Sequence, residues 1–211
     1  MSVRVWVRSR RAWQVGIYHS GMDVYWNAEL VDQLESHWQH QLRPRLNGLT
    51  DDEYFWQPVP GCWTLSRRGQ STAPVSVGEG EFTVDYAMPP RDREPVTTIA
   101  WRLAHLIIMF ASTSASHFGG PAADPATFRY SGTADGALRQ LDDAHDAYVS
   151  GVRGLGAAGL AEPQGPDYPP EYADAPMAKL FLYTNMEIIH HGAEISLLRD
   201  LYLWHDSQDR L

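Results

Sequence analysis

The chain has 211 residues, 44% of them hydrophobic and 11% aromatic, which is enough apolar material for one sizeable core. Its 17 basic and 26 acidic residues give a formal charge of −9, which argues against a nucleic-acid surface. No run approaches the roughly 18 apolar residues needed to cross a membrane. The single cysteine, Cys62, excludes an internal disulfide and suits the reducing cytoplasm in which we expect the protein.

The first 21 residues differ in chemistry from the rest of the chain. Their four arginines occur without one acidic residue, and no apolar core of a signal peptide follows them. We expect residues 1–21 to form a basic arm outside the fold, although a true start at Met22 explains the composition equally well. The predicted folded domain spans 22–205, and residues 206–211 are expected to be a C-terminal tail.

Four segments carry apolar residues at helical spacing and are expected to form an all-α four-helix bundle. Asn47 and Gly48 stop the first of them, and Thr133 is a good N-cap for the third. The four segments span 24–46, 95–118, 134–155 and 178–202. Because two of their connections are long, we expect a bundle that is not a simple up-down-up-down one.

The connection over 57–94 is rich in proline and glycine and is too long for a structureless loop without a role. Residues 81–86 alternate in a strand-like way, which predicts a small hairpin or lid. Trp56, Trp63 and Tyr86 could then cover one end of the bundle, although simple capping of the core by aromatics explains them as well. We expect the second connection, 156–173, to pack on the same end.

Glu187 and His191 lie four residues apart within the most strongly helical segment, so both point to one face of that helix. The other residues on this face are Leu180, Thr184, Leu198 and Tyr202, and those expected on the solvent side are Asn185, Gly192, Ser196, Arg199 and Asp200. Desolvating a carboxylate and an imidazole is costly unless they have a partner, and the face carries no lysine or arginine. A bound metal ion would be such a partner. The alternative is that a single histidine on an apolar face is a core residue whose nitrogen atoms have hydrogen-bond partners.

His105 offers a third ligand, because helical spacing places it on the inward face of the second helix. A core histidine bonded to a carbonyl or to water is the alternative. Glu194 lies on the face of Glu187 and could orient a ligand imidazole or relay a proton. Arg102 is expected to bond either a carboxylate inside the bundle or a substrate anion, and His190 is more peripheral.

The segments 97–105 and 187–195 together resemble the DinB-like (DinB/YfiT) superfamily, and the resemblance extends over about 22–204. It implies a four-helix bundle that holds a divalent metal, with one histidine from the second helix and two ligands one turn apart on the fourth. The implied ligands are His105, Glu187 and His191. Many members have histidine at both fourth-helix positions. This chain has Glu187 at the first of them, as do the members that resemble mycothiol-dependent maleylpyruvate isomerase.

The resemblance implies a metal-dependent thiol S-transferase or thiol-assisted isomerase that acts on a small-molecule electrophile. Two histidines and one carboxylate leave coordination positions open, with Zn²⁺ expected first and Ni²⁺, Mn²⁺ or Fe²⁺ also compatible. Glu194 and Arg102 are the candidate catalytic residues. The 16 arginines against the single Lys179 are typical of GC-rich genomes, which favours an actinobacterial host and hence mycothiol as the low-molecular-weight thiol.

Two alternatives to an enzyme stay open. In the first, the metal site is structural or vestigial, and the bundle serves for homodimer formation or stress-linked binding. In the second, the protein binds a metal or a small ligand without turnover.

Overall fold

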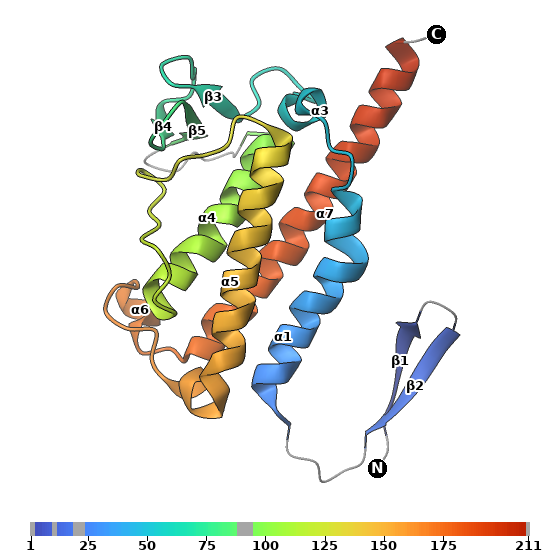
Figure 1. Ribbon diagram of the computed structural model, residues 1–211, viewed down its shortest axis with the longest axis vertical. Helices are drawn as coiled ribbons and strands as arrows, with labels where there is room; N and C mark the ends of the chain where they lie inside the picture. The colour runs from blue at the N-terminus through green and yellow to red at the C-terminus, as the bar shows by residue number, and fades with distance from the viewer. Residues whose placement is uncertain (1–2, 10–11, 19–23, 88–94, 210–211) are drawn as a thin grey trace.

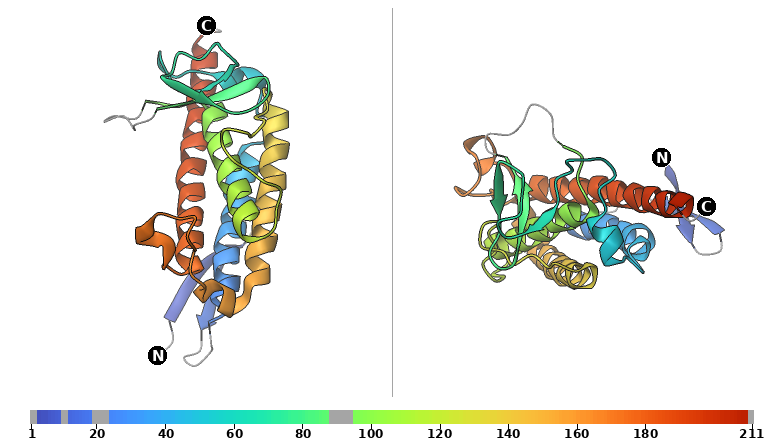
Figure 2. Two further views of the ribbon diagram at one scale, coloured as in Figure 1. Left: turned by 90° about the vertical axis from the view of Figure 1, so that its left-hand side faces the viewer. Right: turned by 90° about the horizontal axis from the view of Figure 1, so that it is seen from above.

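The computed structural model describes residues 3–9, 12–18, 24–87 and 95–209, and in these residues the fold is mostly helical (Figure 1). This confirms the predicted helical bundle. The long helical segments lie side by side, and a small sheet covers one end of them (Figures 1 and 2). The bundle helices are α1 (Trp26–His37), α4 (Ile99–His117), α5 (Ala134–Ala161) and α7 (Met177–Asp209).

The first helix does not stop at the end of α1. It continues through one π-helical turn, η1 (Trp38–Leu42), into the short helix α2 (Arg43–Arg45), and α3 (Asp51–Phe55) follows. In Figure 1, α1 and α7 run toward the sheet, whereas α4 and α5 both run away from it. The bundle therefore does not have a simple up-down-up-down topology, and this confirms the prediction. The segment 118–133 makes the crossover between the parallel helices α4 and α5.

Two threonines begin helices of the bundle. The Thr98 side chain accepts a hydrogen bond from the Trp101 amide at the start of α4, and Thr133 accepts one from the Gly136 amide at the start of α5. The helix α5 runs past its predicted end at residue 155, but the chain is kinked at Gly156, where φ is +65°. Leucine, isoleucine and aromatic side chains from all four helices fill the core between them.

The predicted solvent side of α7 is wrong for several residues. The Asn185 side chain is buried and donates to the Leu30 carbonyl at 2.9 Å, and Arg199 forms an ion pair with the buried Glu53. Gly192 packs closely against the first helix, where an added Cβ would lie 3.1 Å from His37. These polar and small residues face inward because α1, η1 and α3 supply partners for them, whereas a helical wheel treats polar residues as exposed.

The predicted strand over 81–86 is confirmed as β5 (Phe82–Tyr86). It lies at the centre of a three-stranded antiparallel sheet, between β3 (Leu65–Arg67) and β4 (Val75–Val77). The sheet is tied to the start of α4, since the Thr98 hydroxyl donates to Thr64 at 2.9 Å and the Trp101 indole donates to the Asp85 carbonyl at 2.9 Å. These bonds place the sheet beside the first two turns of α4.

The second connection does not lie at the sheet end, contrary to our expectation. It contains α6 (Pro170–Ala173) and packs at the opposite end of the bundle (Figures 1 and 2). There the Tyr168 hydroxyl lies 2.8 Å from Nε2 of His117, near the end of α4. The physical reason is the direction of α5, which runs away from the sheet and so delivers the following segment to the far end.

Both ends of the chain contain regular secondary structure. The segment predicted as a basic arm forms an antiparallel hairpin of β1 (Val3–Ser9) and β2 (Ala12–Tyr18), with Val3 opposite Tyr18. The helix α7 continues to Asp209, into the predicted tail. Met22 lies outside the described residues. No helix in the described ranges is long and apolar enough to span a membrane.

Candidate metal centre

The three predicted ligands meet where the second turn of α4 faces the middle of α7. Nε2 of His191 lies 3.1 Å from Oε2 of Glu187, and Nε2 of His105 lies 3.7 Å from the same oxygen. The two imidazole rings are perpendicular, with their centroids 4.8 Å apart. One ligand atom from each residue falls within 4.8 Å of the others, which is compatible with a single shared cation.

His105 carries the observation that tests whether a metal fits. Its Nε2 atom is buried and has no hydrogen-bond partner, a feature that it shares with five other side-chain atoms of the described residues, and a buried polar atom of this kind calls for a partner. Burial lowers the pKa of His105 to about 4, so its imidazole is neutral at physiological pH. Neutral imidazole is the form that binds metals, and the cluster therefore fits a divalent cation.

His191 is held from its other side by a carboxylate. Its Nδ1 atom lies 2.5 Å from Oε2 of Glu194, and Arg102 binds the same carboxylate with Nε at 3.0 Å and Nη2 at 3.2 Å. Nη1 of Arg102 also lies 3.2 Å from this nitrogen, but the shorter contact with Glu194 favours the tautomer in which Nδ1 carries the proton and donates it, which leaves the Nε2 lone pair directed to the cluster. A carboxylate in this position fixes the ring and raises the basicity of a ligand histidine.

A second group of potential ligands, made by His190, His191 and Glu194, is chemically weaker. Its carboxylate is already engaged by Arg102, and the Nδ1 atom of His191 is engaged by that carboxylate. His190 is exposed, with Nε2 3.4 Å from Oε1 of Glu194. The first cluster is better suited to a cation because it contains the orphaned nitrogen of His105.

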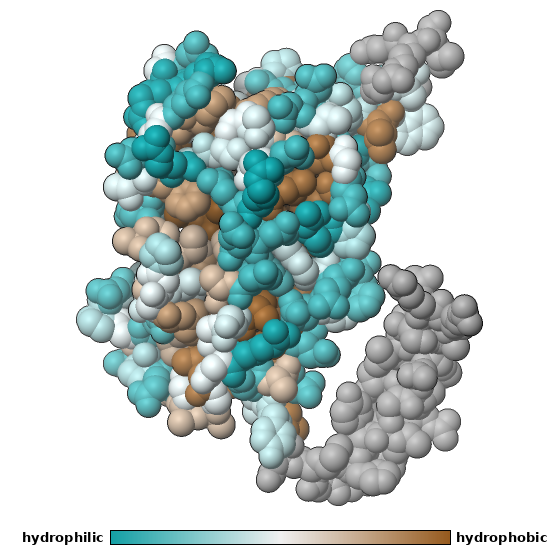
Figure 3. Space-filling view, in the orientation of Figure 1, coloured by the Kyte–Doolittle hydropathy of each residue, from teal (hydrophilic) through white to brown (hydrophobic). Residues whose placement is uncertain are grey.

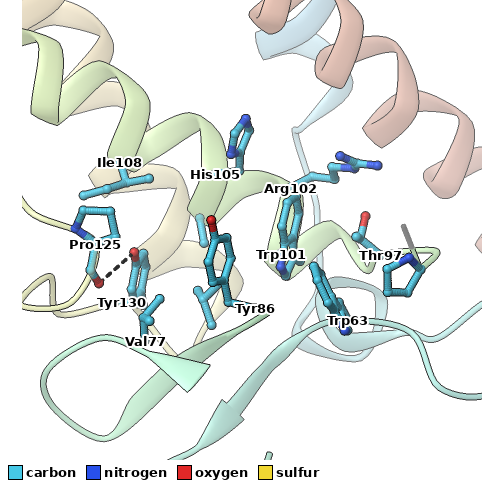
Figure 4. A pocket seen from close by; sticks show the side chains of 13 residues that line it. Trp63, Val77, Tyr86, Thr97, Trp101, Arg102, His105, Ile108, Pro125 and Tyr130 are labelled. Atoms are coloured by element: carbon cyan, nitrogen blue, oxygen red, sulfur yellow. Dashed lines mark hydrogen bonds between the residues drawn. The ribbon is translucent and has the colours of Figure 1, made fainter. Parts of the chain in front are cut away.

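A pocket of about 440 Å³ opens beside His105, within the usual size range of small-molecule sites (Figure 4). One group of lining residues comes from the sheet end, namely Trp63, Tyr86 and Trp101, and Figure 4 shows a second group with Ile108, Pro125 and Tyr130. The His105 ring stacks on Trp101, with centroids 5.5 Å apart and planes 10° apart. Figure 3 shows apolar residues gathered below the sheet on this face of the molecule.

The arrangement of the aromatics was predicted only in part. Trp63 and Tyr86 line the pocket beside the cluster, whereas Trp56 lies elsewhere and packs edge-on against Tyr202 and His205 at 5.7 Å. Pro125 and Tyr130 were missed altogether, because they belong to the crossover 118–133, which has no periodic pattern. The signal that could have drawn attention to this crossover is its pairing of proline with aromatic residues.

A family model described as the DinB superfamily matches residues 33–195, which include all three residues of the cluster. No curated protein and no solved structure matches the chain.

Proposed function

The chain belongs to the DinB superfamily, and from this and its side-chain cluster we propose a divalent-metal-dependent enzyme that joins a low-molecular-weight thiol to small electrophiles. It would act as an S-transferase or as a thiol-assisted isomerase. The observation that supports this best is the orphaned Nε2 of His105, which faces Glu187 and borders an apolar pocket. Active sites commonly combine such ligand sets with an adjoining cavity.

His105, Glu187 and His191 would hold the ion. Two imidazoles and one carboxylate leave coordination positions for other molecules, which is the pattern of catalytic rather than closed structural sites. We propose Zn²⁺, although Ni²⁺, Mn²⁺ and Fe²⁺ also suit these ligand types. An ion bound there supplies a Lewis acid that lowers the pKa of a coordinated thiol and so makes thiolate available at neutral pH.

The protein residues around the cluster would position the reactants. Glu194 fixes the ring of His191, and Arg102 holds Glu194 in place through two contacts. Both are therefore positioning residues in this proposal. Trp101 and Tyr86 would exclude water from the electrophile beside His105, which limits competing hydrolysis.

The proposed reaction is balanced without an oxidant or a reductant. In an addition, the thiol sulfur bonds to the electrophilic carbon, the π electrons move to the neighbouring carbon, and that carbon receives the proton lost by the thiol. In an isomerisation, the adduct rotates about its carbon–carbon bond, the neighbouring carbon loses the proton that it received, the double bond forms again as the sulfur–carbon bond breaks, and the released thiolate takes up the proton. The arginine-rich composition, with a single lysine, supports mycothiol as the thiol.

The test measures thiol consumption by the metal-loaded protein. Mycothiol, bacillithiol, glutathione and cysteine are each combined with a panel of electrophiles, and free thiol is followed over time. We expect turnover by the wild type and by Glu171→Gln, which changes an exposed carboxylate on α6. Glu187→Gln should keep its helical circular dichroism and lose turnover.

An outcome without thiol consumption above background would favour the alternative, a bundle that binds a metal or a small ligand without turnover. Saturable binding of an electrophile without product would support that alternative directly. Loss of helical structure on chelation would instead indicate a structural ion.

A further inference from the structure

The pocket beside His105 is lined mainly by apolar atoms, and Figure 4 shows the Tyr86 hydroxyl as one polar group in it. The Trp101 indole N–H is already donated to the Asp85 carbonyl at 2.9 Å, and the Tyr130 hydroxyl to the Pro125 carbonyl at 3.3 Å. The faces of Trp63 and Trp101 are tilted by 35° with their centroids 6.2 Å apart. Flat aromatic groups are the ligands that such surfaces contact well, through stacking and edge-to-face packing.

The charge around the pocket disfavours an anionic ligand. Arg102 is the cation among the described lining residues, and its guanidinium is bound to the Glu194 carboxylate at 3.0 Å and 3.2 Å. It also lies 5.1 Å from the centre of the Trp101 ring, at the edge of the cavity. A ligand carboxylate seated among the aromatic walls, away from the cluster of His105, Glu187 and His191, would lose its hydration without gaining a partner charge, which is costly.

We propose that this pocket binds the substrate as a neutral aromatic electrophile, such as an aryl enone, with its ring between Trp101 and Ile108. This inference rests on the proposed function for its chemical step and on the pocket alone for its binding step. The thiol sulfur would bond to the β-carbon of the enone, and the α-carbon would receive the proton that the thiol loses. Figure 4 shows His105 at the rim of the same pocket, so the electrophilic end would lie toward the cluster.

Binding is tested with a pair of probes of similar size, 2-acetylnaphthalene and 2-naphthoate. The metal-free protein is used, since a bound ion would itself attract a carboxylate. We expect 2-acetylnaphthalene to bind at least about tenfold more tightly than 2-naphthoate by fluorescence titration. Ile108→Trp fills the cavity and should abolish binding, whereas Val59→Trp, at an exposed loop position, should not change it.

Equal or tighter binding of 2-naphthoate, absence of binding by both probes, or unchanged binding in Ile108→Trp would overturn the assignment. The proposed function fails separately. Probe binding without thiol consumption in the enzyme assay would support the pocket assignment and contradict the proposed enzyme function. Turnover only with carboxylated electrophiles would contradict the neutral-substrate assignment and support the proposed enzyme function.

Discussion

Replacing Glu194 by glutamine should weaken metal binding without unfolding the protein. The side chain keeps its shape, but it loses the charge that lies 2.5 Å from Nδ1 of His191 and that Arg102 neutralises from the other side. Loss of a carboxylate behind a ligand histidine typically reduces metal affinity about 10–100-fold, which corresponds to about 1.4–2.7 kcal/mol. Since Glu194 is half-buried and partly hydrated, we expect the lower half of that range.

The affinity is measured by competition for Zn²⁺ with a chromophoric chelator. Glu162→Gln, an exposed carboxylate after α5, is the matched control and should bind like the wild type. Arg102→Gln should also lower the affinity, because Arg102 contacts the Glu194 carboxylate with Nε at 3.0 Å and the Nδ1 atom of His191 with Nη1 at 3.2 Å. If Glu194→Gln binds Zn²⁺ as tightly as the wild type, the reasoning that Glu194 orients His191 is refuted.

Two further predictions concern stability. Glu53→Gln should cost about 3–5 kcal/mol and lower the thermal midpoint by about 6–20 °C, because it leaves Arg199 buried without its carboxylate partner. Asp200→Asn, which breaks the exposed pair with Arg45, should change stability by less than about 1 kcal/mol, and equal effects of the two variants would contradict this account. Burial lowers the pKa of His145 below its usual value, so the unfolded chain takes up a proton at this residue before the folded one does and stability falls as the pH drops below about 6.5. The free energy of unfolding of the metal-free protein, measured with urea, should fall by up to about 1.4 kcal/mol per pH unit because of this group. His145→Gln should show a correspondingly shallower dependence on pH. An identical pH dependence in the variant and the wild type would exclude His145 as the cause.

The helices, and the shared face of Glu187 and His191, could be predicted because each has a local signal. The i, i+4 spacing of Glu187 and His191 places both on one face, and Thr98 and Thr133 mark the starts of α4 and α5. His105 followed from the same periodicity and from the family resemblance. The structure brings these three ligands within reach of one cation, on two helices far apart in the chain.

The features that could not be predicted depend on tertiary partners. Asn185 and Arg199 are polar and were assigned to solvent, but the Leu30 carbonyl and Glu53, both distant in sequence, make their burial favourable. The pocket likewise needs Tyr130 from the crossover, whose position follows from the parallel direction of α4 and α5. A periodic pattern reports which residues share a face but not which face meets a partner.

Metal content of the purified protein tests the central claim most directly. Plasma mass spectrometry should find about one divalent ion per chain in the wild type, because His105, Glu187 and His191 offer one set of ligands. Replacing any one of them by alanine should lower that content, with helical circular dichroism as the control for folding. Unchanged stoichiometry after all three replacements would contradict the account.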